Sequence, residues 1–367
     1  MTTSAPDAPG LTAPRPAAGE RPVPKPRPAA RPRTALVLGA GGVLGFAWTI
    51  GALSAVLDET DFDIGDVDVV IGTSAGSVLA SLLAAGLPVD GIRRHHQGVP
   101  APTDPHIDWD YDRGAGGSLP RRPGLRLGSP RLTVAGLRPG AGIRPVVALS
   151  GLLPTGRGTL DPVTAMVTTL RPRARAWPRR PQPWIVSTDY ATGERVVFGW
   201  PHGTPVRPAG FRAARPGGTP DLGRAVAASC AIPGWYRPVV VDGRAHIDGG
   251  TASNTSLDLL LDPHRGARLE RVVVLAPMAA IEPDRPRSPA LRVERAVRRA
   301  ISRSLQSDAA ALRAAGVEVT LLAPDADDLE LIGVNMMDPR RRRDVLLTAE
   351  RGAARRLRRS GRPRRSA

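Results

Sequence analysis

The sequence DVDVVIGTSAGSVLASLLAAGL, residues 66–87, joins a β-branched run to an Ala- and Leu-rich run through a short turn bounded by glycines. The first run predicts a buried strand and the second a helix that ends near Gly86. The same plan precedes it, with TALVLGAGG at 34–42 predicting a strand and GFAWTIGALSAVLDE at 45–59 a helix. Two successive strand, turn and helix units indicate an α/β fold in which helices cover a mostly parallel sheet.

The turn in the first of these stretches has the pattern G-x-S-x-G. Gly72 and Gly76 lie two residues before and two after Ser74. Such glycines let a strand turn into a helix sharply enough to lift the serine Oγ clear of the backbone. Because the strand and the helix that the motif requires are both predicted, Ser74 is a candidate nucleophile. A plain glycine-bounded turn is the alternative interpretation.

The other glycine-rich turn, LGAGGVLG at 38–45, could hold a phosphate or an oxyanion, since backbone N–H groups at a helix N-terminus favour negative charge. As a dinucleotide-binding fingerprint it fails in spacing, because Gly39 and Gly41 would need Gly or Ala at the position of Leu44. We therefore favour an oxyanion. A nucleotide-binding protein of the Rossmann type is the less favoured alternative, since it leaves the G-x-S-x-G turn unexplained.

A third motif is Asp-Gly-Gly at 248–250, which follows a short predicted strand. Glycines after Asp248 permit the close approach of another loop, although a turn aspartate is the common role of such a motif. His246 lies two residues earlier, on the side of the strand to which Asp248 should also point. It is the one histidine near other candidate chemistry, and a Ser-His-Asp triad would need it.

These motifs resemble the patatin-like phospholipases over Leu36 to Leu261, a family with a G-G-G-x-[Arg/Lys]-G loop, a G-x-S-x-G elbow and a D-G-[Ala/Gly] turn. The resemblance implies a three-layer α/β fold, with helices on both faces of a mostly parallel sheet. It further implies a serine acyl ester hydrolase acting on lipids, of phospholipase A or lysophospholipase type, which needs no cofactor. In this family Ser74 would be the nucleophile and Asp248 the base, without a histidine.

The resemblance also assigns an oxyanion hole to the backbone amides of Gly41, Gly42 and Val43. The loop departs from the family pattern at two positions, with Ala40 in place of the first glycine and Leu44 in place of the basic residue. Because the hole is built from backbone N–H groups, neither change removes it in principle. A patatin-like lipid-binding protein with weak or no catalysis is the alternative that these departures leave open.

Composition along the chain predicts four segments. Residues 1–33 are a disordered tail rich in Pro, Ala and Arg. Residues 34–262 are the catalytic domain that the resemblance implies, and the Pro- and Gly-dense stretch at 99–158 is a cap-like insertion that we expect to supply most of the pocket lining. Residues 263–338 add strands and a helix that complete the domain. Residues 339–367 are an arginine-rich tail, either an interfacial anchor or a helix that packs on the domain.

The chain carries 51 Lys and Arg against 34 Asp and Glu, a net charge of +17. Such a charge suits an anionic membrane surface or a nucleic acid, but the arginines accompany a general Ala, Pro and Gly bias, and no specific nucleic-acid site is predicted. With the single cysteine Cys230 and no ligand-spaced cluster, no metal centre is expected. No long uninterrupted apolar run is present, so we expect a soluble protein. The single cysteine fits the reducing cytoplasm, and peripheral membrane association is left as an open alternative. Oligomeric state is left open.

Overall fold

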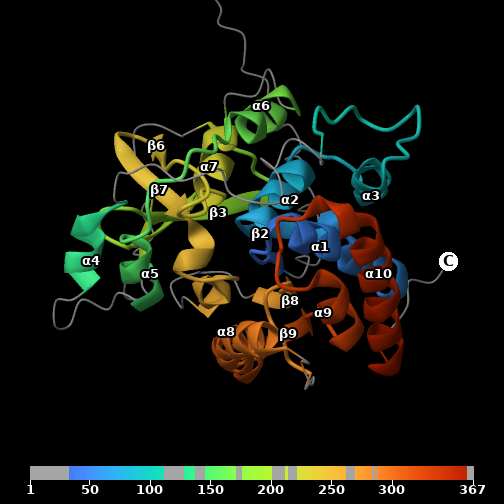
Figure 1. Ribbon diagram of the computed structural model, residues 1–367. Coiled ribbons are helices and arrows are strands. Elements are labelled where there is room, and N and C mark those ends of the chain that lie inside the picture. Colours follow the sequence, from blue (N-terminus) through green and yellow to red (C-terminus); the bar gives the residue numbers. More distant parts are fainter. Residues whose placement is uncertain are drawn as a thin grey trace, which may run out of the picture. The chain divides into compact units, whose positions relative to one another are not determined.

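A nine-stranded sheet forms the centre of the protein (Figure 1). The computed structural model describes residues 33–110, 128–136, 145–170, 176–200, 211–213, 221–261, 269–282, 286 and 288–361. The strand order is β5-β4-β3-β2-β1-β8-β9, with β7 paired to β3 and β6 paired to β7. The strands are β1 (Arg33–Leu38), β2 (Val67–Thr73), β3 (Gln182–Asp189), β4 (Arg195–Phe198), β5 (Phe211–Ala213), β6 (Val239–Val241), β7 (Arg244–Asp248), β8 (Leu269–Leu275) and β9 (Glu318–Leu322).

Strands β3, β2, β1, β8 and β9 run parallel to one another, as the repeated strand and helix units predict. The antiparallel pairs are β3 with β4, β3 with β7 and β6 with β7. The β3–β4 hairpin turns near Ala191, and the β6–β7 hairpin turns at Asp242. The prediction of a mostly parallel sheet is therefore confirmed.

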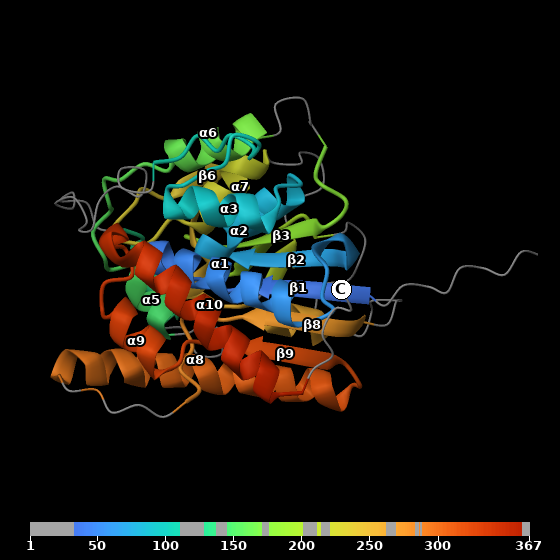
Figure 2. The ribbon, with the colours of Figure 1, turned by 90° about the vertical axis from the view of Figure 1, so that its right-hand side faces the viewer.

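Helices cover both faces of the sheet, so the predicted three-layer arrangement is also confirmed (Figure 2). Successive residues of β1 alternate between two buried clusters, with Leu36 and Leu38 in one and Ala35 and Val37 in the other. The first cluster includes side chains from α1 (Gly42–Glu59), α2 (Ala75–Ala84), α3 (Val89–Gln97), α6 (Asp161–Leu170), α7 (Leu222–Ser229), α9 (Ala326–Ile332) and α10 (Arg342–Arg359). The second includes side chains from α8 (Pro289–Ala314) and the short 3₁₀ helix η3 (Leu257–Leu261).

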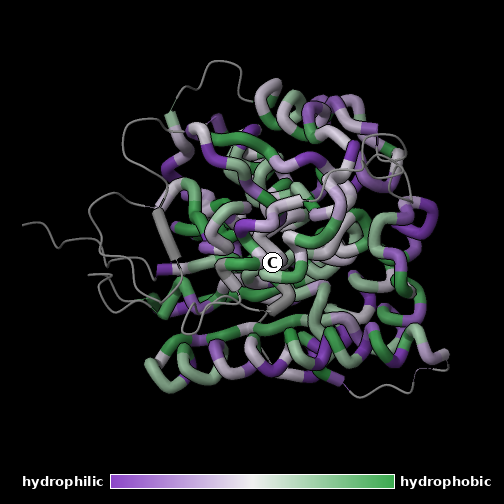
Figure 3. The backbone as a smooth tube through the Cα atoms, turned by 60° about the vertical axis from the view of Figure 1, so that its left-hand side comes forward, coloured by the Kyte–Doolittle hydropathy of each residue, from purple (hydrophilic) through white to green (hydrophobic). Residues whose placement is uncertain are grey.

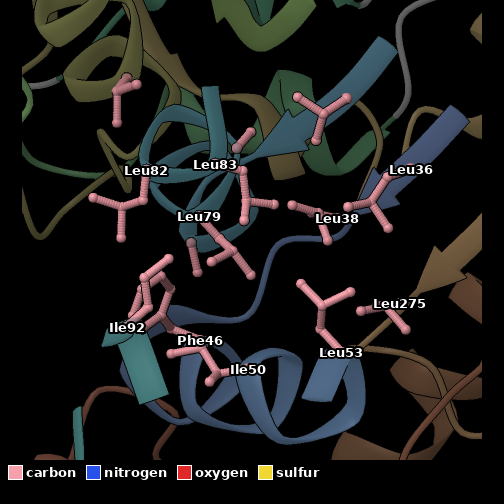
Figure 4. Close-up of a cluster of buried hydrophobic side chains, with 14 of the residues drawn as sticks. Leu36, Leu38, Phe46, Ile50, Leu53, Leu79, Leu82, Leu83, Ile92 and Leu275 are labelled. Atoms are coloured by element: carbon pink, nitrogen blue, oxygen red, sulfur yellow. The ribbon is translucent and has the colours of Figure 1, made fainter. Parts of the chain in front are cut away.

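The larger cluster joins the first two strand and helix units (Figure 4). Leu38 of β1, Leu53 of α1 and Leu79 of α2 are all fully buried in it. Figure 3 shows hydrophobic and hydrophilic residues alternating along the peripheral helices, as expected where one side of a helix packs on the sheet. This packing holds the N-termini of α1 and α2 at the carboxyl ends of the parallel strands β1 and β2. The two glycine turns therefore lie at the same end of these strands.

By length and composition alone, helix α1 could span a membrane. The sequence analysis looked for long uninterrupted apolar runs and therefore did not identify this helix. Most of it, 78% of the window, is buried inside the domain, as in the core helix of a globular fold. It begins at Gly42, three residues before the predicted start at Gly45, because the first turn is made by the glycine loop itself.

Residues 342–359, which the sequence analysis placed in an arginine-rich tail, form α10 and pack against α1. At Gly51 of α1 a Cβ would lie 2.2 Å from the carbonyl oxygen of Leu346, so the two helices approach closely. The packed side is an apolar stripe within the arginines, and its buried residues are Val345, Leu346, Ala349, Gly352, Ala353 and Leu357. Of the two alternatives for this segment, an interfacial anchor or a packed helix, the packed helix is the one found for residues 342–359. Residues 1–32 and 362–367 lie outside the described residues.

Within the predicted insertion at 99–158, the structure describes two short helices, α4 (Pro130–Gly136) and α5 (Pro145–Ser150). Leu132 and Val147 from these helices are buried with Tyr190 and Ile247. Residues 111–127 and 137–144 of the insertion lie outside the described part of the chain. The remaining 3₁₀ helices are η1 (Ile64–Asp66), η2 (Gly249–Thr251) and η4 (Pro339–Arg341).

Candidate active site

Strand register brings the elbow and the Asp-Gly-Gly motif together on one edge of β3. β2 runs parallel to β3 and ends with Thr73 paired to Val186. β7 runs antiparallel to β3 and ends with Asp248 paired to Ser187, the next residue of β3. The carboxyl ends of β2 and β7 therefore meet head to head on adjacent positions of the same strand. Ser74, the residue after β2, and Asp248, the last of β7, are brought to the same place from 174 residues apart in the sequence.

Ser74 sits in the strained backbone conformation that a nucleophile elbow requires. Its φ of 52° and ψ of −122° are uncommon for a residue with a side chain, and it lies at the N-cap of α2. At Gly76 a Cβ would lie 2.1 Å from the carbonyl oxygen of Leu38, so only glycine allows α2 to start this close to the end of β1. The contact also places the elbow beside the glycine loop that follows Leu38.

The last residue of α7 and the two residues after it are hydrogen-bonded to both candidate residues. The backbone N–H of Ser74 donates to Ser229 Oγ at 2.8 Å, and that hydroxyl donates to the carbonyl of Val186 at 2.6 Å. Two residues on, the carbonyl of Ala231 accepts from the N–H of Asp248 at 2.9 Å. Ser229 to Ala231 therefore sets the separation of Ser74 and Asp248. Sequence reasoning did not single out Ser229, the last residue of α7.

Asp248 is buried, and its two carboxyl oxygens have different surroundings. Oδ1 accepts from the N–H of Gly250 at 2.7 Å, whereas Oδ2 has no hydrogen-bond partner in the part of the chain that the structure describes. Burial raises the pKa of this carboxyl to about 6, and the nearby Ser74 hydroxyl and the Gly250 N–H offset part of that rise. A carboxylate with this pKa is mostly ionised at neutral pH and can accept a proton.

The glycine loop presents backbone donors at the start of α1. Gly41 is the N-cap, and the N–H of Leu44 donates to the carbonyl of Met336 at 2.9 Å. No hydrogen bond among the described residues uses the N–H groups of Gly41, Gly42 or Val43. Gly42 and Val43 line a cavity that Ser74 also lines. Unsatisfied amides at a helix N-terminus beside a candidate nucleophile suit the binding of an oxyanion.

Both departures from the family loop pattern have a structural explanation. A Cβ at Gly250 would lie 3.1 Å from the Cβ of Ala40, so glycine in the Asp-Gly-Gly turn leaves room for the alanine of the loop. Leu44 is fully buried in the larger core cluster, where a basic side chain would lose its hydration. The loop is thus supported by apolar packing at this position and by the Met336 carbonyl.

The cavity beside Ser74 has a volume of about 90 Å³ and a largely apolar wall. Its lining residues are Gly42, Val43, Phe46, Ser74, Ala75, Val78, Leu82, Trp109, Leu160, Val163, Met166, Cys230, Ile232, Tyr236 and Met337. The expectation that residues 99–158 supply most of the lining is wrong for the described residues, because only Trp109 comes from that stretch. Leu160 and α6 provide that side of the wall instead, since the apolar side of α6 packs over α7 and α2.

Cys230 lines this cavity beside the Ser77 hydroxyl, with Sγ and Oγ 3.7 Å apart. Burial, followed by the negative charge of Asp248, raises the pKa of the Cys230 thiol. The thiol therefore stays protonated at neutral pH and is a poor nucleophile. Of the two nucleophilic side chains at this site, Ser74 is the one in an activating geometry.

His246 is directed elsewhere. Its Nδ1 lies 3.0 Å from the Ser187 hydroxyl, and its ring packs on Phe198 with 5.3 Å between the ring centres. It is not among the residues that line the cavity. Among the described residues, no group of three or more His, Cys, Asp or Glu side chains is arranged to hold a metal ion.

The candidate site lies within a region of the chain that matches a known family. A family model described as patatin-like phospholipase matches residues 36–261. The chain belongs to the patatin-like phospholipase family. The match spans β1 to η3 and so contains the glycine loop, Ser74 and Asp248 of the patatin-like domain.

No curated protein matches the chain. Among solved structures, the patatin-like chain is similar to VipD from Legionella pneumophila, with 14% identity and a TM-score of 0.40 over 90% of this chain and 67% of VipD. It is also similar to the type III effector protein ExoU, with 16% identity and a TM-score of 0.34 over 90% of this chain. The chain spans about half the length of ExoU, 53%.

Proposed function

We propose that this protein is a serine acyl ester hydrolase that acts on lipids through a Ser74–Asp248 dyad, as a phospholipase A or lysophospholipase. Membership of the patatin-like phospholipase family supports a lipid ester hydrolase. The observation that carries the finer assignment is the head-to-head meeting of β2 and β7 on β3, which brings a strained serine beside a buried carboxylate with a free Oδ2.

In the proposed reaction, Ser74 Oγ attacks the acyl carbonyl while Asp248 Oδ2 accepts the hydroxyl proton. The N–H groups of Gly41, Gly42 and Val43 stabilise the oxyanion of the tetrahedral intermediate. Its collapse breaks the ester bond, and the leaving alcohol takes the proton from Asp248. Water then attacks the acyl-enzyme and gives a proton to Asp248, which returns it to Ser74 Oγ as the fatty acid leaves. The apolar cavity would accommodate the acyl chain next to the ester.

Fatty-acid release from phospholipid and lysophospholipid in mixed micelles tests the proposal, with p-nitrophenyl butyrate as a soluble ester. Hydrolysis of the soluble ester together with at least one of the lipids is the expected result. A folded chain that binds lipid but hydrolyses neither substrate class would instead support the alternative of a catalytically inactive patatin-like protein. The buried position of Leu44 and the fit of Ala40 against Gly250 favour an intact loop and hence the active form.

Hydrolysis of the soluble ester should depend on the ionisation of Asp248. The base works only as a carboxylate, so kcat/KM should fall as pH decreases through the pKa of about 6 and reach a plateau above about pH 7. Initial rates between pH 4.5 and 8.5, corrected for loss of folded protein, measure this profile. A flat profile through pH 6 contradicts the assignment of Asp248 as the base.

Ser229 should act as a positioning residue. Ser229→Ala removes the acceptor of the buried Ser74 N–H and the donor to Val186, so the strained elbow can relax away from Asp248. We expect kcat to fall roughly 10- to 100-fold while KM changes less than about threefold, because the cavity wall is unchanged. Ser81→Ala is the matched control, since its buried hydroxyl donates to Val78 within α2. A rise in KM at constant kcat would contradict the positioning role.

A further inference from the structure

Helices α4 and α5 and the residues after them expose a group of large aliphatic side chains. Val134, Leu149, Leu152 and Leu153 are between 45% and 59% exposed. We call these four residues the apolar patch. They are four of the eleven large hydrophobic side chains exposed in the described part of the chain, and they come from a window of 20 residues. Such a concentration of exposed apolar surface marks an interaction site more often than chance exposure does.

The patch lies on the outer side of a unit that is fixed to the domain. Leu132 and Val147, two residues before Val134 and Leu149 on their helices, are buried against Tyr190 and Ile247. Two positions along a helix are about 200° apart, so Val134 and Leu149 face away from the domain. The two helices are tied together by the bonds from Thr133 Oγ1 to the Ala148 carbonyl (3.0 Å) and from the Ser129 N–H to the Gly151 carbonyl (2.9 Å).

A segment of seven residues connects the patch to the wall of the cavity at the candidate active site. The chain runs from Leu153 to Leu160, which lines the cavity, in seven residues. On the way, the N–H of Gly158 donates to the Trp235 carbonyl at 3.0 Å, and the Gly158 carbonyl accepts from Arg237. Tyr236, between those two residues, is a cavity residue. The patch is therefore joined to the cavity wall by a short segment that is hydrogen-bonded on both sides of Tyr236.

The charged residues of the sequence around the patch have one sign. In the sequence, residues 113–160 contain eight arginines and no Asp, Glu or Lys. Of these arginines, two are described and exposed: Arg131, three residues before Val134 on α4, and Arg157, four residues after Leu153. Aliphatic side chains that enter the acyl boundary, flanked by arginines, suit a surface that is apolar inside and anionic outside. A second copy of this surface would bring like charges together, which disfavours self-association through it.

We propose that the apolar patch, with Arg131 and Arg157, docks on the surface of an anionic phospholipid bilayer. The inference rests on the proposed lipid substrate, and it states how the enzyme would meet that substrate. Val134, Leu149, Leu152 and Leu153 enter the headgroup boundary, the two arginines contact anionic headgroups, and the cavity wall at Leu160 and Tyr236 lies beside the membrane.

The test is flotation of the full chain with vesicles of phosphatidylcholine alone or with phosphatidylglycerol, at low and high salt. Leu149→Ser/Leu152→Ser should weaken binding to the anionic vesicles roughly tenfold or more, because less apolar surface enters the bilayer. Arg131→Gln/Arg157→Gln should weaken it several-fold and reduce its sensitivity to salt. The matched control is Val293→Ser/Val297→Ser on α8, where the two valines are 67% and 53% exposed beside Arg292 and Arg299.

The control variant should bind like the unmodified chain. Equal loss in the control and patch variants, or unchanged binding by both patch variants, overturns the proposal. A patch variant that changes the mass of the protein in solution but not its vesicle binding would also overturn it, in favour of a protein partner. Hydrolysis of p-nitrophenyl butyrate is measured alongside and should be unchanged in all variants. Its absence from the unmodified chain would count against the proposed function, while the binding comparison would still decide the docking surface.

Discussion

Ser74→Ala is expected to lower kcat for p-nitrophenyl butyrate by at least about 10³-fold, and Asp248→Asn should cause a loss of similar size. The serine is the group that forms the acyl-enzyme, and the buried carboxylate accepts its proton. Because the two side chains act as one unit, the double variant should be no slower than Ser74→Ala alone. Steady-state kinetics of the three variants measure this non-additivity.

His246→Gln is the matched control for the dyad, since its ring contacts Ser187 and Phe198 on the neighbouring strands. It should keep most of the activity. Circular dichroism and thermal unfolding of all variants separate a chemical loss from a folding loss, and Asp248→Asn keeps the shape of the side chain. Activity in Ser74→Ala close to that of the unmodified chain excludes the dyad, and a loss in His246→Gln as large as in Asp248→Asn favours a triad.

Deletion of residues 339–367 is expected to destabilise the domain strongly. It removes α10, whose buried Val345, Leu346 and Leu357 each contribute on the order of 1.5–3 kcal/mol to the free energy of unfolding. A total loss of roughly 5 kcal/mol lowers the Tm by about 7 °C in a domain of about 330 residues, and a larger loss lowers it in proportion. It also approaches the whole stability of an ordinary protein, about 5–15 kcal/mol.

Deletion after Gly361 is the control for this prediction, because it keeps α10 whole while it removes three of the terminal arginines. Its Tm should match that of the full chain. Thermal unfolding of both truncations, followed by circular dichroism, gives the comparison. If the longer deletion melts at the temperature of the full chain, the packing of α10 on α1 does not stabilise the domain.

Local sequence patterns were sufficient to predict the elements that carry the candidate site. The β-branched run before Gly72 and the Ala- and Leu-rich run after Gly76 are β2 and α2, and the apolar run before Gly39 is β1. These patterns are strong because parallel strands of an α/β sheet are buried on both faces and are therefore continuously hydrophobic. The family resemblance that the motifs suggested is likewise confirmed.

The sequence could not predict the contacts that join the site. The antiparallel pairing of β7 with β3, directly beyond the end of β2, depends on residues far apart in the chain, and no local pattern encodes that register. The same holds for Ser229, whose hydroxyl reaches Ser74 across 155 positions. For α10 the sequence left a packed helix and an interfacial anchor open, because the apolar residues at helical spacing among its arginines do not show what they pack against.

The central claim is that Ser74 is an activated nucleophile, and labelling with a fluorophosphonate probe tests it most directly. Such a probe reacts covalently only with a serine whose proton is removed and whose oxyanion is stabilised. The folded chain is incubated with the probe near pH 7.5, where Asp248 is mostly ionised, and the adduct is located by peptide mass mapping beside Ser74→Ala. We predict one adduct, on Ser74, that is absent from the variant. Labelling of a different serine, or none in a folded chain, would contradict the claim.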